Sequence, residues 1–154
     1  MKVGSELTQS LTHDDEAILR RWVSSESYGL NEKLRNMEDL TDDDKKFIAD
    51  LDTALSKLPD YEGILYRSID SSGIDDIAAF RERHTVGETV TYAQYTSASA
   101  DVYDETMDIQ FVIKSKRAKD ITKINPDEKE YLFKRNSKFK VTKAENNTIY
   151  LEEE

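Results

Sequence analysis

The sequence has no cysteine and only two histidines, His13 and His84, which stand far apart along the chain. The missing thiols exclude disulfide bonds, thiolate metal sites and a cysteine nucleophile. Two separated histidines offer too few ligands for a histidine-based metal cluster. We therefore expect chemistry that uses no bound metal.

Long apolar runs are also missing. No stretch approaches the roughly 20 apolar residues of a membrane-spanning helix, and Met1–Ser10 lacks the pattern of a signal peptide. The sequence therefore predicts no membrane partner, while export by a route that needs no signal peptide stays open.

Basic residues are fewer than acidic ones: the chain has 22 Lys and Arg and 32 Asp and Glu, which gives a net charge of −10. This balance argues against a general nucleic-acid binder, whose affinity comes from basic contacts to phosphate. The charge is uneven, since residues 114–143 contain 11 basic and 4 acidic side chains. This basic segment could attract phosphates, although a solvated surface hairpin would have the same composition.

A chain of 154 residues predicts one domain, residues 1–154, in which residues 1–10 form a loose polar lead. The first third has the pattern of helices. Thr12 and Thr41 each begin a T-x-x-D sequence, a form of the capping box that starts a helix. Residues 30–35 continue as a further helical piece after Gly29.

The remaining two thirds change to short segments of β-branched and aromatic residues. We expect strands at residues 64–67, 89–92, 94–96, 109–113, 129–133, 139–142 and 148–151. Gly73 opens a short helix, the small residues 97–100 end a strand, and residues 116–127 form a loop long enough to suspect function. Helices followed by strands indicate an α+β fold.

Two glutamates, Glu128 and Glu130, flank Lys129 at the start of the apolar run Tyr131–Phe133. In a strand they share one face, because side chains alternate with a period of two. Two carboxylates facing one space suit two roles in one reaction. A solvated strand face in an acidic protein would give the same pattern, so the pair needs support from elsewhere in the chain.

Three motifs supply that support by their order: Leu65-Tyr66-Arg67, Thr96-Ser97-Ala98-Ser99 and Glu128-Lys129-Glu130. With its helical lead, the chain resembles over nearly its whole length the Arg/Ser-Thr-Ser/Glu-x-Glu class of mono-ADP-ribosyltransferases, the class of the clostridial actin-modifying toxins. The resemblance implies N-terminal helices followed by two packed, mainly antiparallel β-sheets that form an NAD cleft. Each motif alone is common, and the signal lies in their joint order and strand contexts.

The resemblance implies a role for each carboxylate. The reaction breaks the bond between ribose and nicotinamide in NAD through an oxocarbenium-like state, as in glycosidases. Glu130 would stabilise the ribose cation, and Glu128 would orient or deprotonate the acceptor. In this family a Glu at the first position accompanies arginine acceptors.

The other motif residues would bind NAD by the same resemblance. Arg67, flanked by Tyr66 and Ser68, would meet the diphosphate or adjacent ribose with its donor fork. Ser97 would hold the rotamer of Glu130, and Ser99 would shape the nicotinamide pocket. As isolated residues, Arg67 could equally be a surface cation and the serines could be turn residues.

Further positions match less closely. Ala98 replaces the central threonine of the serine motif, and Tyr103 is the nearby aromatic that could cover the nicotinamide, in an uncertain register. Asn31 lies on a helix whose family counterpart approaches the adenine. Loop residues Ile121, Lys123 and Ile124 could contact a substrate protein or could be ordinary loop residues.

The sequence thus predicts a mono-ADP-ribosyltransferase that uses NAD as co-substrate and modifies an arginine of a target protein. We expect a monomer that acts in a cytosol, as a secreted effector or toxin domain or as a phage protein, and a nucleic-acid acceptor is disfavoured. Two alternatives stay open. An NAD glycohydrolase would use water as the acceptor, and a non-catalytic module would keep only the fold.

Overall fold

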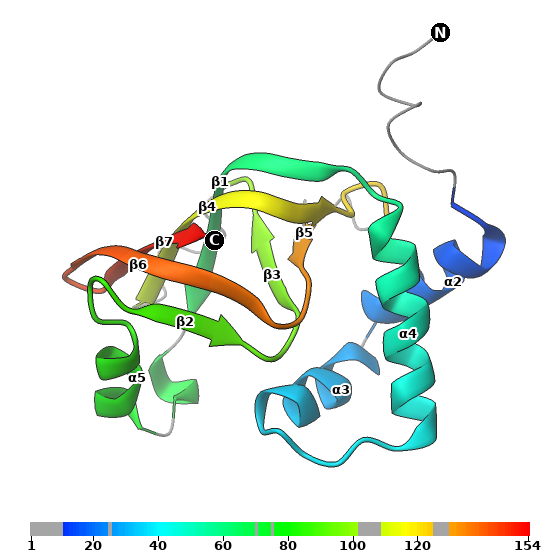
Figure 1. The fold of residues 1–154 in the computed structure, drawn as a ribbon, viewed down its shortest axis with the longest axis horizontal. Helices are drawn as coiled ribbons and strands as arrows, with labels where there is room; N and C mark the ends of the chain where they lie inside the picture. The colour runs from blue at the N-terminus through cyan, green and yellow to red at the C-terminus, as the bar shows by residue number, and fades with distance from the viewer. Residues whose placement is uncertain (1–10, 25, 70, 75, 102–108, 125–129) are drawn as a thin grey trace, which may run out of the picture.

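The structure is a computed structural model that describes residues 11–154 apart from residues 25, 70, 75, 102–108 and 125–129. Figure 1 shows three helices gathered on one side of the strands and a fourth, shorter helix below β2. The four helices within the described residues are α2 (His13–Trp22), α3 (Glu26–Arg35), α4 (Asp42–Ser56) and α5 (Ile77–Arg83). None of these helices is long and apolar enough to cross a membrane.

Both predicted capping boxes are present. Thr12 accepts from the backbone of Asp15, and Thr41 accepts from the backbone of Asp44, while each aspartate accepts in return from its threonine's backbone. These contacts satisfy backbone N–H groups that the first helical turn leaves without partners. Asp15 also receives Lys57 Nζ at 2.6 Å, which ties the start of α2 to the end of α4.

The strands form one continuous hydrogen-bonded sheet in the order β1-β3-β5-β4-β7-β6-β2, and β1 also pairs with β4. Pairing is antiparallel except between β4 and β7. The α+β class is confirmed. The strands of the two expected sheets belong to one hydrogen-bonded network, in which β1, β3, β5 and β4 pair in a closed ring. The strands are β1 (Asp60–Ile69), β2 (Thr89–Tyr92), β3 (Thr96–Ser99), β4 (Ile109–Asp120), β5 (Glu130–Phe133), β6 (Ser137–Glu145) and β7 (Thr148–Glu153).

Several expected boundaries were wrong. Residues 116–120 continue β4 instead of starting a loop, and Ser97–Ser99 lie inside β3 instead of ending a strand. Gly29 lies within α3. The helix expected from Gly73 begins at Ile77, because Asp76 caps it by accepting from the backbone of Ala79.

Two apolar cores flank the middle strands. The first lies between the helices and the sheet, where Leu51 and Leu55 of α4 have no exposed surface and each contribute roughly 1.5–3 kcal/mol. Trp22 of α2 packs edge-on against Tyr95, with ring centroids 5.0 Å apart. The second core lies among the strands and includes Leu65 and Phe133. The strands β1, β3 and β5 are therefore packed between the two cores, which fixes their position.

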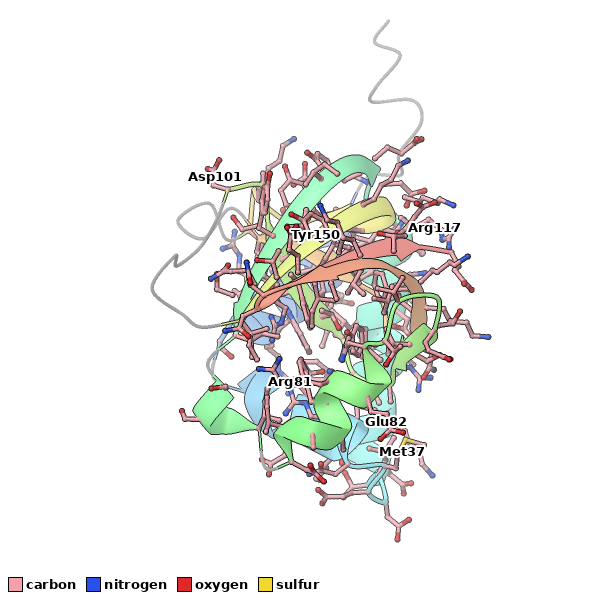
Figure 2. All side chains as sticks on the ribbon, turned by 90° about the vertical axis from the view of Figure 1, so that its left-hand side faces the viewer. Met37, Arg81, Glu82, Asp101, Arg117 and Tyr150 are labelled. Atoms are coloured by element: carbon pink, nitrogen blue, oxygen red, sulfur yellow. The ribbon has the colours of Figure 1, made fainter. Side chains whose placement is uncertain are left out.

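Helix α5 lies against the strands at the other side of the molecule from α4 (Figure 1). Phe80 stacks against Phe111 of β4, and Arg81 donates to Asn147 in the turn between β6 and β7 at 3.2 Å. Arg81 is labelled on this helix in Figure 2, which faces that side of the molecule.

Candidate functional site

Strand β3 lies between β1 and β5, and its register aligns the three sequence motifs. Ser99 is opposite Tyr66 on one side and opposite Glu130 on the other. Segments that are about 30 residues apart in the chain are thereby brought side by side. A cavity of about 150 Å³ opens at this crossing, and its walls are Tyr66, Arg67, Ser68, Ser97, Ala98, Ser99 and Glu130.

Glu130 is the buried carboxylate of this cavity, with 7% of its surface exposed. The hydroxyl of Ser97 donates to Glu130 Oε2 at 2.5 Å. Ser97 and Glu130 share one face of the sheet, because Ser97 is two residues from Ser99, the register partner of Glu130. The structure thus brings Ser97 against Glu130, and a carboxylate held in one rotamer suits the stabilisation of a positive charge.

Arg67 lies beside this pair. Its Nη1 donates to the carbonyl of Ser97 at 2.9 Å, which leaves the remaining donors of the guanidinium for other partners. Burial lowers the pKa of Arg67, the positive charge of Arg35 lowers it further, and Tyr92 and Glu130 oppose these effects. Within the described residues no carboxylate forms an ion pair with Arg67, so the effect of the Arg35 charge on Arg67 is not balanced by a direct ion pair.

A second, larger cavity of about 450 Å³ adjoins the first and shares Arg67. It carries three arginines, Arg35, Arg67 and Arg83, among aromatic side chains. Thr96 also lines it, and Thr96 Oγ1 is buried without a hydrogen-bond partner in the described part of the chain. A long ligand with an anionic centre would find cationic and apolar contacts here.

Arg35 and Arg83 were not among the predicted site residues. A signal for Arg35 exists in the sequence, because it ends the helical stretch Leu30–Arg35 that carries part of the family resemblance. Arg83 gives no comparable signal. It reaches the cavity from α5, and its Nη2 also donates to the carbonyl of Thr91.

Asn31 lines neither cavity. Its Nδ2 donates to the carbonyl of Tyr95 at 2.8 Å, and its Oδ1 accepts from the backbone N–H of Tyr95 at 2.9 Å. Both ends of the amide are therefore engaged with the residue that precedes β3. Asn31 therefore connects α3 to the residue before β3 through two hydrogen bonds.

His84 borders the second cavity, and burial lowers its pKa, which favours the neutral imidazole. Its Nδ1 lies 2.8 Å from the carbonyl of Phe80, which can only accept, so Nδ1 carries the proton. Its Nε2 then accepts from the hydroxyl of Tyr92 at 2.7 Å. No group of three or more potential metal ligands is found among the residues that the structure describes.

Glu128 and Tyr103 lie outside the described residues. Of the loop residues left open above, Ile121 has no exposed surface and belongs to the first core, against which Ile124 also packs. Ile121 is therefore a core residue. Lys123 is exposed, which leaves it available to a partner.

Comparisons with known proteins agree with this geometry. The sequence model of the family described as ADP-ribosyltransferase exoenzyme matches residues 1–153. A Mycobacterium avium (strain 104) protein with the provisional name NAD(+)–arginine ADP-ribosyltransferase Mav is 35% identical over 139 residues, which cover 85% of this chain and 16% of that protein.

Solved structures share the fold. The type III effector XopAI from Xanthomonas axonopodis pv. citri superposes with a TM-score of 0.76 at 22% identity, over 91% of this chain and 62% of that one. The Clostridium limosum C3 exoenzyme gives a TM-score of 0.74 at 20% identity, over 94% of this chain and 87% of that one. The chain thus spans a small part of the Mav protein and under two thirds of XopAI. By the family match over residues 1–153, the chain belongs to the ADP-ribosyltransferase exoenzyme family.

Proposed function

We propose that this chain cleaves the nicotinamide–ribose bond of NAD and transfers ADP-ribose to an arginine of a target protein. The observation that carries the proposal is the hydrogen bond from Ser97 to Glu130 inside a cavity that also holds Arg67. The 35% identity to a protein named as an NAD–arginine ADP-ribosyltransferase supports the acceptor class.

The two cavities fit the two halves of NAD. The smaller cavity, with Glu130 at its wall, would take the nicotinamide and its ribose. Arg67, which both cavities share, and Arg35 would bind the diphosphate, whose negative charge offsets the repulsion between the two guanidinium groups. The aromatic and apolar wall of the larger cavity would receive the adenosine.

In the reaction, positive charge develops on the ribose as nicotinamide leaves. The carboxylate of Glu130 would stabilise that charge more in the transition state than in the ground state. It would also accept a hydrogen bond from a ribose hydroxyl, which holds the sugar in place. The guanidinium of the acceptor arginine attacks the anomeric carbon, and Glu128 accepts the proton that this guanidinium loses. Ser97 is a positioning residue in this scheme, because it acts through Glu130.

The test is incubation with labelled NAD and cell lysate, with nicotinamide release and protein labelling measured separately. We expect Glu130→Gln to lower both by about 10²-fold or more, which is the cost of removing one group that stabilises transition-state charge. Glu128→Gln should lower labelling much further than nicotinamide release. The exposed Glu62→Gln on β1 is the matched control.

The possible outcomes separate the alternatives. Equal loss of both activities in Glu128→Gln would remove the role given to Glu128, and nicotinamide release without labelling would identify a glycohydrolase. No nicotinamide release from the unaltered protein would leave a non-catalytic module. Mapping by mass spectrometry that finds labelled residues other than arginine would overturn the acceptor class. We propose that a monomer acts in this way on proteins of a cytosol, as an effector domain, because XopAI is named an effector.

A further inference from the structure

Strand β4 contains a bulge at the point where it leaves β7. Its register with β1 pairs Gly63 with Ser115 and Tyr61 with Ala118. Glu62 alone therefore lies opposite two residues, Lys116 and Arg117, which is the pattern of a β-bulge. The pairing of β4 with β7 ends just before this point, at Lys114 and Glu152.

A bulge leaves backbone N–H groups without a hydrogen-bond partner in the neighbouring strand. In this bulge, one carboxylate accepts hydrogen bonds from two such groups. Glu153 Oε1 accepts from the N–H of Lys116 at 2.6 Å and from the N–H of Arg117 at 2.7 Å. Glu153 continues the buried side of β7 after Ile149 and Leu151, and only 3% of its surface is exposed. A buried carboxylate is stable only with such donors, because burial without them costs several kcal/mol.

The side chain of Arg117 adds a weaker contact. Its Nε lies 3.5 Å from Glu153 Oε2, and 56% of the side chain is exposed. Arg117 is labelled in Figure 2 at the surface of the molecule. The two backbone amides are therefore the main partners of Glu153, and the guanidinium is secondary.

Beyond the bulge, β4 changes its neighbour. Lys119 and Asp120 pair with Leu132 and Tyr131 of β5. The N–H of Ile121 then donates to the carbonyl of Glu130 at 3.2 Å. The backbone of Glu130 is thus held on one side by Ser99 of β3 and on the other by the part of β4 that follows the bulge.

We propose that Glu153 is a positioning residue for Glu130, which acts by holding the β4 bulge in the conformation that lets β4 support β5. The catalytic consequence rests on the proposed function, whereas the structural consequence does not. Glu153 touches neither cavity, so it affects the site only through β4 and β5.

The structural test is amide hydrogen exchange on the folded full chain. In Glu153→Ala, the amides of Lys116 and Arg117 lose their acceptor, and we expect the Ile121 amide to exchange at least about 10-fold faster. The amide of Gln110, which donates to Asn147 before the bulge at 3.0 Å, should keep its protection. In Glu153→Gln, which retains an acceptor oxygen, Ile121 should exchange nearly as in the unaltered protein.

The kinetic test is nicotinamide release from NAD. Displacement of Glu130 should lower kcat in Glu153→Ala by about 10- to 100-fold, while KM for NAD changes by less than about 3-fold, because Arg67 and Arg35 stay in place. Glu153→Gln should recover most of the rate. Glu152→Ala is the matched control, since its side chain is partly exposed and its residue is adjacent on β7.

The inference is overturned if the Ile121 amide is unaffected in Glu153→Ala, or if Ile121 and Gln110 accelerate equally, as in general destabilisation. It is also overturned if Ile121 accelerates while kcat is unchanged. Should the alanine variant not fold, Glu153→Asp repeats the test with a carboxylate one methylene shorter. If the unaltered protein releases no nicotinamide, the proposed function fails, and hydrogen exchange alone decides the role of Glu153.

Discussion

At the scale of single residues, Glu130 depends on the hydroxyl of Ser97, which donates to its carboxylate. A hydrogen bond to a charged group is worth roughly 1.5–3 kcal/mol, so Ser97→Ala should lower kcat for nicotinamide release about 10- to 100-fold. Thr142→Ala on β6 is the control, since Thr142 is exposed and lines neither cavity. Equal losses in the two variants would contradict a specific role for Ser97.

The residues that bound the site could be identified from the sequence to a large extent. Tyr66, Arg67, Ser68, Ser97 and Glu130 were predicted and lie together on one cavity. Their assembly could not be derived from local pattern, because the order β1-β3-β5 is set by pairing between segments far apart in the chain. The resemblance to a family, rather than periodicity, carried that part of the prediction.

At the scale of elements, α3 controls the start of β3 through Asn31. Replacement by leucine removes two hydrogen bonds and leaves the N–H and C=O of Tyr95, a residue with 1% exposure, without partners. We expect the free energy of unfolding in urea to fall by about 2–4 kcal/mol, since each unsatisfied buried group costs roughly 1–3 kcal/mol. The neighbouring exposed Glu32→Gln should change it by less than about 0.5 kcal/mol. A decrease below about 1 kcal/mol in the free energy of unfolding of Asn31→Leu would contradict this role of Asn31.

The boundaries of elements show why sequence patterns fail in particular places. The helix starts at Thr12 and Thr41 were predictable, because a capping box is a local device. The second half of β4 was not, since the bulge at Lys116 and Arg117 breaks the alternation that identifies a strand. Its stabilising partner, Glu153, is 36 residues further along the chain, beyond the reach of any local pattern.

At the scale of the whole molecule, His84 makes stability depend on pH. Burial chiefly, and then the charge of Arg83, lower the pKa of His84, while its bond to the Phe80 carbonyl opposes them. The unfolded chain, with a histidine pKa near 6.5, therefore binds the proton first as pH falls. Stability from the neutral form is fully present above about pH 6.5 and should decline below it, by at most about 1.4 kcal/mol per pH unit.

The measurement is urea unfolding between pH 7 and pH 5. The His84→Gln variant should show a flatter dependence than the unaltered protein. Asp15 and Asp44 do not interfere, because hydrogen bonds with Lys57 and with Lys33, respectively, lower their pKa values below 3.8, and their contributions are lost only in stronger acid. Identical slopes in the unaltered protein and His84→Gln would exclude His84 as the source.

The last strand of the chain, β7, lies inside the sheet, between β4 and β6. During synthesis, β4 and β6 therefore leave the ribosome before the strand that joins them exists. Because folding must wait for contacts between distant segments, the central sheet closes only after residues 148–153 have emerged. A nascent chain that ends after β6 would contain every residue that lines the two cavities and would still lack the strand that joins β4 to β6.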